Sequence, residues 1–407
     1  MRDIVFLCDK RMNTKTGFLV ALSNISETTN ILLVERGYEQ FYSLPEGLFS
    51  AVFEVEDITR IDQVEEVFER ILDEYDVERV IAPTENVVET GGYLRSRFGI
   101  PGIQKNQAET VRNKWIMKET LRQAGIHTSQ TRIASNAVQI RKIVAGIGFP
   151  IIIKPISGWA TIMTYRLNNQ EELEQYISHS WNRESVLIEE FITGREFHID
   201  SIVSEGELVF SSVSEYLFNC LEIVQNDRPS GTICYPANTH YEYVERMQSF
   251  NEEIIRTLGI RNSVFHAEVF LLPNGEICFG EIGARIGGIV IIPPMVLNSH
   301  QVNLFDAAIQ TELGIYEAPT LVNTGKYTGA VNFPSAVGKI ESISSAEDFK
   351  SMEGLIDIRI NFTSGQSISG GRDTMSRSGY AIVEGPDIEF VRKQLLELHD
   401  KFVLVHQ

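Results

Sequence analysis

Short apolar runs alternate with helical patterns over the first hundred residues of this 407-residue chain. The runs at 3–8, 30–34 and 77–82 predict strands. Apolar positions repeat at helical spacing over 61–75, and a further helix is expected over 87–98. Strands that alternate with helices in this way favour a parallel α/β sheet.

The rest of the chain predicts two further units. A helix over 108–125 leads into a second α/β segment that ends near residue 315, and the last part shows a small α+β pattern. We therefore expect three domains, at residues 1–107, 108–315 and 316–407. In the third, strands are expected at 325–333, 355–362 and 379–383, with helices near residue 347 and over 387–402. Its Gly/Ser-rich loop 363–378 is long enough to predict a functional or a disordered segment.

A hairpin signal brings two carboxylates together. Asn274-Gly275 is typical of a two-residue turn, and such a turn would place Glu268 opposite Glu281. Their Cβ atoms should then lie ~5 Å apart. The same register predicts an apolar face and a polar face. The apolar face would hold Phe265, Ala267, Val269, Leu271, Cys278 and Ile282, and the polar face His266, Glu268, Glu281 and Gly283.

Two like charges in that position destabilise a sheet unless something neutralises them. A hard divalent cation, above all Mg²⁺, would do so, and Mg²⁺ held by one or two carboxylates usually also binds substrate phosphates. Arg285, Gly287 and Gly288 follow directly, and a fixed cation with flexible backbone N–H donors suits a transferring phosphoryl group. The alternative is an exposed hairpin whose glutamates face water.

Composition narrows the possible partners. A net charge of −19 argues against a nucleic-acid or anionic-membrane surface. Hydrophobic content of 43% and charged content of 22% are ordinary for a soluble globular enzyme. The four cysteines are scattered, which favours a reducing cytoplasm, and the apolar run at 4–8 is too short for a signal peptide.

A second group of signals suggests a nucleotide site. Lys154 lies on an apolar strand ahead of a turn that contains Ser157, Gly158 and Thr161. A strand lysine beside such a loop can hold phosphate, although most strand lysines are solvated edge charges. The spacing is not that of a P-loop.

The segment 186–200 carries further polar groups. Its first strand ends at Glu189, a short hinge follows at 192–194, and Glu196 opens a second strand with alternating polar positions. A carboxylate there could hold ribose hydroxyls, and hinge backbone groups could bind the edge of adenine. The alternative is a strand with one charged face.

These motifs together resemble the ATP-grasp superfamily over nearly the whole chain. The matching segments are Asn113-Lys114 ahead of WIMKETLRQAGI, the strand IIIKP, the hinge IEEFITGRE, and the acidic pair in HAEVF and GEIGARIGG. The resemblance implies an N-terminal Rossmann-like α/β domain, a two-lobed nucleotide-binding centre and a small α+β C-terminal domain.

The resemblance also implies roles for individual residues. Lys114 and Lys154, with the loop of Ser157, Gly158 and Thr161, would bind ATP phosphates. Glu189 and the Ile192 backbone would lie at adenine and Glu196 at ribose, while Glu268 and Glu281 would hold one or two Mg²⁺ ions, with Mn²⁺ as the alternative ion. Many members have Asn where this chain has Gly283, which leaves the second ion open.

The pattern E-x-x-x-R-x-G-G over 281–288 and the ninety-residue C-terminal unit are most similar to the amino-acid ligase branch, which includes bacterial dipeptide synthetases. That branch implies formation of an acyl phosphate from an amino-acid carboxylate and its attack by an amine. Arg285 and the N–H groups of Gly287 and Gly288 would stabilise the reacting groups. Loop 363–378 would act as a lid.

Four residues are candidates for contact with the amino acid: Glu85, His266, Ile289 and Asp373. Glu85 follows a predicted parallel strand, where ligands of such sheets bind, although a helix N-cap is an equally good interpretation. Ile289 is equally well explained as core. The net negative charge of the chain favours a neutral or basic amino acid over aspartate or glutamate as the activated substrate.

Other readings of the function stay open. The acceptor could be a carrier-protein thiol or another amine in place of a second amino acid, and a nucleotide-binding regulator without catalysis is the alternative from a different class. We expect a cytoplasmic protein, with a homodimer as an open alternative to a monomer.

Overall fold

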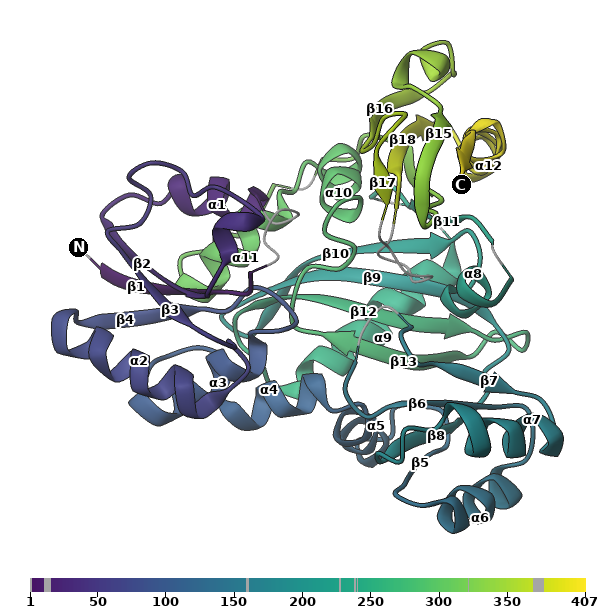
Figure 1. Ribbon diagram of the computed structural model, residues 1–407, viewed down its shortest axis with the longest axis horizontal. Coiled ribbons are helices and arrows are strands. Elements are labelled where there is room, and N and C mark those ends of the chain that lie inside the picture. The colour runs from purple at the N-terminus through teal and green to yellow at the C-terminus, as the bar shows by residue number, and fades with distance from the viewer. Residues whose placement is uncertain are drawn as a thin grey trace.

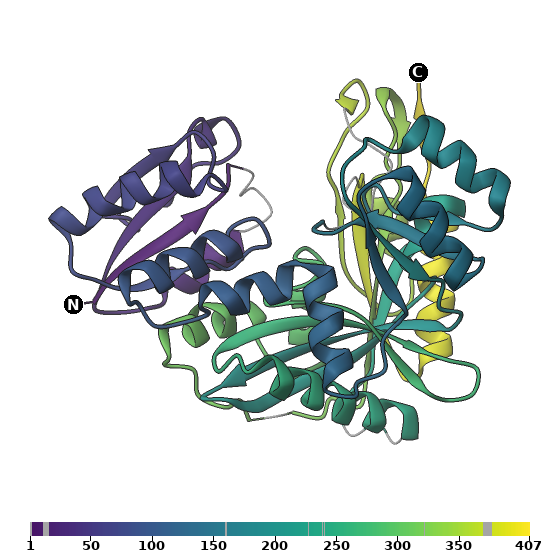
Figure 2. The same cartoon turned by 90° about the horizontal axis from the view of Figure 1, so that it is seen from below.

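The fold is given by a computed structural model, which describes residues 2–10, 16–158, 161–226, 228–237, 239, 241–320, 322–368 and 377–407. The chain forms an N-terminal part, a small lobe and a long sheet that continues into the C-terminal part (Figure 1). Seen from below, the N-terminal part stands on one side and the other two stand opposite it (Figure 2). No helix of the described chain is both long enough and apolar enough to cross a membrane.

The N-terminal sheet is parallel, as the sequence predicts, and its strand order is β3-β2-β1-β4. Its strands are β1 Arg2–Cys8, β2 Thr28–Glu35, β3 Ala51–Val55 and β4 Val77–Ile81. Its helices are α1 Thr16–Ser23, α2 Ile61–Glu74 and α3 Val88–Phe98, with a 3-10 turn at Tyr38–Gln40. Strand β3 was not predicted, because it lies at the sheet edge and only Val55 in it is buried.

The single helix predicted over 108–125 is wrong. The chain forms α4 (Lys105–Arg112) and α5 (Lys114–Gln123), which are separated at Asn113. Asn113 has extended backbone angles, and its side-chain oxygen accepts hydrogen bonds from the N–H groups of Trp115 and Ile116, both at 3.1 Å. An Asn that caps a helix in this way begins a new helix and so ends the one before it. Lys114 thereby becomes the first residue of α5.

The small lobe is a four-stranded antiparallel sheet with strand order β5-β8-β6-β7. Its strands are β5 Thr131–Ala134, β6 Ile151–Pro155, β7 Tyr165–Leu167 and β8 Val186–Glu190. Helices α6 (Ala137–Ile147) and α7 (Gln170–Gln175), with a π-helical turn at Tyr176–Ser180, pack on it. Lys154 on β6 and Glu189 on β8 are both carried by this sheet.

The large sheet has eight strands, in the order β13-β12-β9-β10-β11-β14-β18-β16. Five of them precede the C-terminal part: β9 Arg195–Ser204, β10 Glu207–Tyr216, β11 Ser230–Cys234, β12 Ser263–Leu271 and the edge strand β13 Ile277–Gly283. The helices of this region are α8 Cys220–Asn226, α9 Glu242–Leu258, α10 Ile292–His300 and α11 Leu304–Leu313. Strands β9, β12 and β13 carry Glu196, His266, Glu268 and Glu281 of the predicted site.

The C-terminal strands join the same sheet. β14 (Tyr327–Phe333), β18 (Gly379–Gly385) and β16 (Leu355–Ile360) extend it from β11. A separate three-stranded sheet consists of β15 Gly338–Ile343, β17 Ser367–Ile368 and β19 Leu404–His406, accompanied by a 3-10 turn at Ala346–Phe349 and by α12 Ile388–Lys401. The pairing of β11 with β14 therefore links the predicted second and third domains in one sheet.

Helix α11 ties the N-terminal sheet to the large one. Glu312 on α11 accepts a hydrogen bond from the N–H of Ala82 at 3.1 Å and pairs with the buried Arg95. Arg95 in turn donates from Nε to the Val80 carbonyl oxygen at 3.1 Å. These bonds hold the carboxyl end of β4, and with it the following loop that carries Glu85.

Candidate functional site

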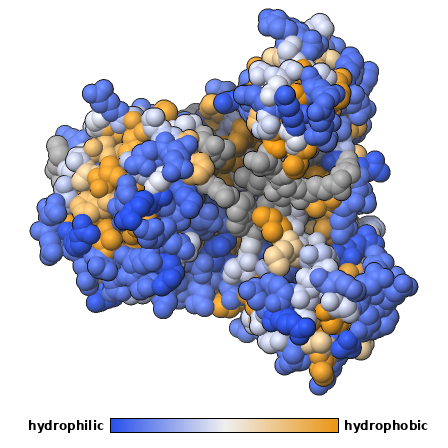
Figure 3. All heavy atoms as spheres, in the orientation of Figure 1, coloured by the Kyte–Doolittle hydropathy of each residue, from blue (hydrophilic) through white to orange (hydrophobic). Residues whose placement is uncertain are grey.

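A cavity of about 810 Å³ opens where the parts of the molecule meet. The space-filling view shows the surface hollowed at this place (Figure 3). Residues from every part line it, among them Asp9, Glu85, Lys114, Lys154, Glu196, Glu268, Glu281, Arg285, Asn332 and Arg377. Small-molecule sites typically enclose roughly 300–1,000 Å³, so the cavity is large enough for a nucleotide-sized ligand or a smaller one with a neighbour.

The predicted pairing of Glu268 with Glu281 is confirmed, because β12 and β13 place them opposite each other. The predicted two-residue turn is wrong. The Leu272 N–H donates to the Glu276 carbonyl oxygen at 2.8 Å, so the loop holds the three residues 273–275. Gly275 adopts a φ of 83°, which completes a three-residue hairpin of the common type.

A bulge at Gly280 corrects the register after the longer turn. Val269 pairs with Phe279, so Gly280 is the extra residue of β13. A Cβ at Gly280 would lie 2.9 Å from the Glu268 carbonyl oxygen, which leaves no room for a side chain. The bulge also moves Cys278 onto the face of Glu268, while Phe279 joins the apolar core. The expectation that Cys278 lies on the apolar face is therefore wrong.

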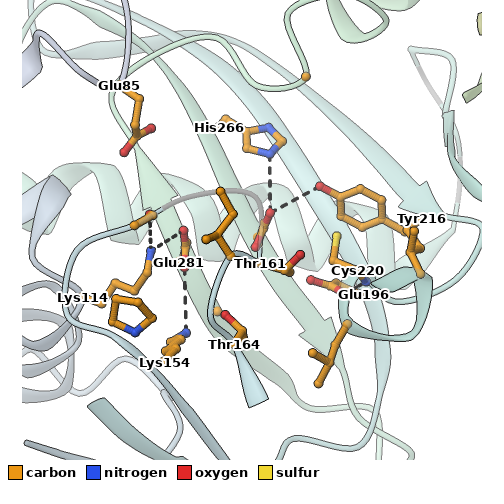
Figure 4. A pocket seen from close by; sticks show the side chains of 18 of the residues that line it. Glu85, Lys114, Lys154, Thr161, Thr164, Glu196, Tyr216, Cys220, His266 and Glu281 are labelled. Carbon is orange, nitrogen blue, oxygen red and sulfur yellow. Dashed lines mark hydrogen bonds and ion pairs between the residues drawn. The ribbon is translucent and has the colours of Figure 1, made fainter. Parts of the chain in front are cut away.

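Two lysines meet at Glu281 (Figure 4). Lys114 donates from Nζ to Glu281 Oε1 at 2.8 Å and to the Gly158 carbonyl oxygen at 2.9 Å. Lys154 Nζ lies 3.9 Å from Oε2 of Glu281. Burial disfavours the ionised carboxylate, but the two lysines outweigh this effect and lower the pKa of Glu281 to about 2. Two lysine ammonium groups therefore lie beside the carboxylate pair.

A third lysine was not singled out from the sequence. Lys118 is buried on α5, and its Nζ donates to Glu189 Oε2 at 2.8 Å and to Ser129 Oγ at 2.7 Å. Lys154 approaches the other oxygen of Glu189 at 3.3 Å. Burial opposes ionisation of Glu189, but Lys118 and Lys154 together lower its pKa below the usual value. Lys118 follows Lys114 by four residues, and this spacing on one helix face was the signal for it.

Glu196 faces the cavity next to the hinge. Its Oε2 accepts a hydrogen bond from the Cys220 N–H at 2.7 Å, and its own N–H donates to Asn219 Oδ1 at 3.1 Å. Burial raises the pKa of Glu196 to about 8, and the nearby charge of Glu268 adds to the effect. Glu196, Cys220 and Glu268 have potential ligand atoms within 4.8 Å of one another.

Glu85 reaches two arginines. Arg112 at the end of α4 donates to one carboxylate oxygen and Arg285 after β13 donates to the other. Helix α3 begins at Val88 without a side-chain cap, so the N-cap interpretation of Glu85 is wrong. Burial lowers the pKa of Arg285, and burial with the charge of Arg285 lowers the pKa of Arg112 to about 10. An incoming carboxylate or phosphoryl group meets two guanidinium groups here.

His266 is held from behind by a second carboxylate. The register places Asp200 on β9 opposite His266 on β12, and His198 opposite Glu268. Asp200 Oδ1 lies 2.9 Å from His266 Nδ1, and Oδ2 lies 2.7 Å from His198 Nδ1. Burial would lower the pKa of His266, but Asp200 outweighs it and raises this pKa to about 9. His198 and Asp200 were noted only as part of an alternating strand.

The other predicted site residues are distributed as follows. Gly158, Thr161, Ile192, Gly288 and Ile289 line the cavity. Ser157 is exposed and does not line it, whereas Gly287 is buried behind it. A Cβ at Gly287 would lie 2.1 Å from His266 Nδ1, so glycine is needed there for the approach of the ring. Asp373 and much of the predicted lid fall in 369–376, outside the described residues.

Two domain families match this chain. An ATP-grasp domain matches residues 147–292, and L-amino acid ligase C-terminal domain 2 matches residues 332–405. Residues 147–292 of the chain therefore form an ATP-grasp domain. Lys154, Glu196, Glu268 and Glu281 all fall within the first match, whereas Lys114 precedes it.

Relatives of this ATP-grasp protein extend the likeness to most of its length. It is 26% identical over 353 residues to the L-arginine-specific L-amino acid ligase of Bacillus subtilis, covering 84% of this chain and 83% of the relative. Identity with dapdiamide A synthase of Enterobacter agglomerans is 23% over 349 residues, covering 81% and 80%. The resemblance to the ATP-grasp ligases is confirmed.

Solved structures share the fold. The L-amino acid ligase of Bacillus licheniformis superposes with a TM-score of 0.79 at 18% identity, over 100% of this chain and 99% of that one. N5-carboxyaminoimidazole ribonucleotide synthetase of Thermotoga maritima gives 0.72 at 15% identity, with both chains fully covered. The expected ATP-grasp fold is therefore confirmed.

The carboxylate pair of this ATP-grasp protein fits a divalent cation. Glu268 and Glu281 lie opposite each other with side chains 28% and 29% exposed, and both line the cavity. Glu268 Oε1 is 3.4 Å from the Tyr216 hydroxyl and 3.8 Å from His266 Nε2. Two hard oxygen donors that face a phosphate-sized space match the preference of Mg²⁺.

Proposed function

We propose that this chain is an ATP-dependent L-amino acid ligase that activates the carboxylate of one amino acid and joins it to the amino group of a second. One observation carries the proposal. Asn332 and Arg377, from the region matched by the L-amino acid ligase domain, line the same cavity as Lys154, Glu268 and Glu281 of the ATP-grasp domain. A single space therefore collects the residues of both families.

The lysines are suited to the nucleotide phosphates. Lys114 and Lys154 lie at the cavity and would turn from Glu281 to phosphate oxygens, while Lys118 fixes Glu189 behind Lys154. Glu196, beside the hinge, is the proposed partner of the ribose hydroxyls. Glu268 and Glu281 would hold Mg²⁺, which when bound neutralises phosphate charge.

The reaction needs little covalent help from the protein. A carboxylate oxygen attacks the γ-phosphorus and ADP leaves, and the amine nitrogen then attacks the acyl carbon as phosphate leaves. Arg285 would release Glu85 and hold oxygens of the acyl phosphate in the fork of its guanidinium. The parts of the chain that line the cavity would limit the access of water to the reactive intermediate.

The N-terminal side of the cavity favours a cationic or zwitterionic substrate. Asp9, Glu35, Asp57 and Glu85 line it, with Lys10 among them. The related Bacillus subtilis ligase is specific for L-arginine. We propose that a neutral or basic amino acid is activated, with Glu85 as the partner of its ammonium group, so Glu85→Gln should raise the amino-acid KM and leave the ATP KM unchanged.

A screen of ADP release tests the function. Amino acids are supplied singly and in pairs with ATP and Mg²⁺, and products are identified by mass spectrometry. Dipeptides formed together with ADP would support the proposal. ADP released only with another amine or a carrier thiol would favour those acceptors, and nucleotide binding without turnover would favour a regulator. The cytoplasmic location and the homodimer stay predictions from the sequence.

A further inference from the structure

A buried polar chain runs through the large sheet behind the cavity. It consists of Thr232, His198, Asp200 and His266, and its successive contacts are 2.9, 2.7 and 2.9 Å. His198 and Asp200 are 0% and 1% exposed. Polar groups that are fully paired in a buried network hold one another in a single geometry. The two end members, Thr232 and His266, line the cavity, and Asp200 lies beside His266 on the neighbouring strand β9.

Two contacts fix the ring of His266. Asp200 Oδ1 accepts the hydrogen of Nδ1, and the backbone at Gly287 lies so close to the ring that a Cβ there would be 2.1 Å from Nδ1. Nε2 is the nitrogen that remains for the cavity, and because each ring nitrogen faces a carboxylate oxygen, both nitrogens carry a hydrogen. Nε2 lies 3.8 Å from Glu268 Oε1.

We propose that Asp200 is a positioning residue for ligation, which holds His266 so that Nε2–H is presented beside Glu268 to a carboxylate oxygen of the bound amino acid. The proposal rests on the proposed function, because it takes the reacting carboxylate as the ligand of His266. A donor that is already oriented stabilises negative charge without reorganising during the reaction. His198 Nδ1 occupies the other oxygen of Asp200, and Thr232 holds His198 through Nε2, so the carboxylate is kept from turning away.

A double-mutant cycle on kcat tests whether Asp200 acts through His266. Asp200→Asn keeps the size of the side chain and removes its charge. His266→Asn keeps an amide N–H near the Nδ1 position, which faces Asp200, and loses the donor at Nε2. His266→Gln places an amide N–H near the Nε2 position and loses the contact with Asp200.

Asp200→Asn should lower the kcat of ADP-forming ligation about 10- to 100-fold, by analogy with carboxylates that orient metal-binding histidines. The ATP KM should stay within about 2-fold, because Lys114 and Lys154 keep their places. In the His266→Asn background the same change should lower kcat by less than about 3-fold, because the donor that it orients is already gone.

Equal losses from Asp200→Asn in both backgrounds would show that Asp200 acts on the fold, and would overturn the proposal. Unchanged kcat in the single variant would overturn it too. Glu215→Gln is the matched control, since Glu215 is a buried carboxylate on the neighbouring strand β10 and does not line the cavity. Its kcat should stay within about 2-fold of the parent.

The His266 variants decide the matter if Asp200→Asn does not fold. His266→Gln should keep more turnover than His266→Asn, and the reverse order would overturn the proposal. Parent turnover with amino-acid pairs is measured in the same assay. An active parent with the wrong mutant pattern would overturn only this inference, whereas a parent inactive with every amino acid would overturn the proposed function as well.

Discussion

Glu281→Gln should destabilise the metal-free protein, although the hairpin pairing alone favours the opposite sign. Removal of one charge relieves the repulsion between Glu281 and Glu268, which lie opposite each other. The same carboxylate, however, accepts a hydrogen bond from the buried Lys114 at 2.8 Å and lies 3.9 Å from Lys154. Glutamine keeps one acceptor oxygen and leaves both ammonium groups without this counter-charge.

The magnitude follows from the burial of the pair. Removal of one partner of a fully buried ion pair costs about 3–5 kcal/mol. Here the Glu281 side chain is 29% exposed and Lys114 keeps its bond to the Gly158 carbonyl oxygen, so roughly 1–3 kcal/mol is expected. Relief of the like-charge pair returns only ~0.2–1 kcal/mol. The net loss in unfolding free energy should be about 1–2 kcal/mol.

Urea unfolding in the presence of a chelator measures this loss as a lower midpoint with an unchanged slope. Glu252→Gln, which removes an exposed carboxylate from α9, is the control and should stay within about 0.5 kcal/mol of the parent. A Glu281→Gln variant as stable as the parent would refute the ion-pair argument. With Mg²⁺ and substrates the variant should lose ADP release, because an amide cannot neutralise the cation; near-parental release would refute the role of the carboxylate pair.

Four further changes probe the site and its support. Lys118→Met should raise the ATP KM at least ~10-fold, since it frees the Glu189 carboxylate to hold Lys154 away from the phosphates. Arg285→Lys should lower kcat with little change in ATP KM, because an ammonium cannot replace the guanidinium fork. Glu196→Ala should weaken ATP binding by roughly 1.5–3 kcal/mol in calorimetry, and binding of a nucleotide without ribose hydroxyls by less. Asn113→Ala should cost about 1 kcal/mol in urea unfolding, through loss of the α5 cap.

Three of these predictions have a stated outcome that would contradict them, and the fourth has a matched control variant. An unchanged ATP KM in Lys118→Met would remove Lys118 from the nucleotide site, and a rise in ATP KM alone for Arg285→Lys would place Arg285 in nucleotide binding. Equal losses for both nucleotides would separate Glu196 from the ribose. Asn113→Asp keeps a capping oxygen and should retain most of the stability that Asn113→Ala loses.

The hairpin shows which features a local sequence pattern predicts and which it does not. Asn274-Gly275 predicts the turn, and the opposition of Glu268 to Glu281 was confirmed, yet the loop has one residue more than predicted. The bulge at Gly280 compensates, and it was not foreseen because the reason for it is the Glu268 carbonyl on the neighbouring strand. The misplaced face of Cys278 is the consequence.

The buried polar chain could not be predicted from local sequence patterns. His198 and Asp200 alternate along one strand in the sequence, which is equally typical of a solvated face. Only the pairing of β9 with β12 places Asp200 against His266 and encloses both. Lys118 is an intermediate case. Its spacing from Lys114 on one helix face can be read from the sequence, but its partner Glu189 lies on a strand of the small lobe, which only the fold brings near.

The sequence by itself determined the parallel N-terminal sheet, the motifs that carry Lys114, Lys154 and the two glutamates, and the resemblance to ATP-grasp proteins. Periodicity, turn residues and motif spacing are properties of neighbouring residues, so they can be recognised without the fold. The tertiary structure alone decided that the C-terminal strands join the large sheet, that Glu85 meets Arg112 and Arg285, and that Asp200 supports His266. These contacts join residues up to 200 positions apart. Strand order and burial set them, and neither is encoded in any short window of the chain.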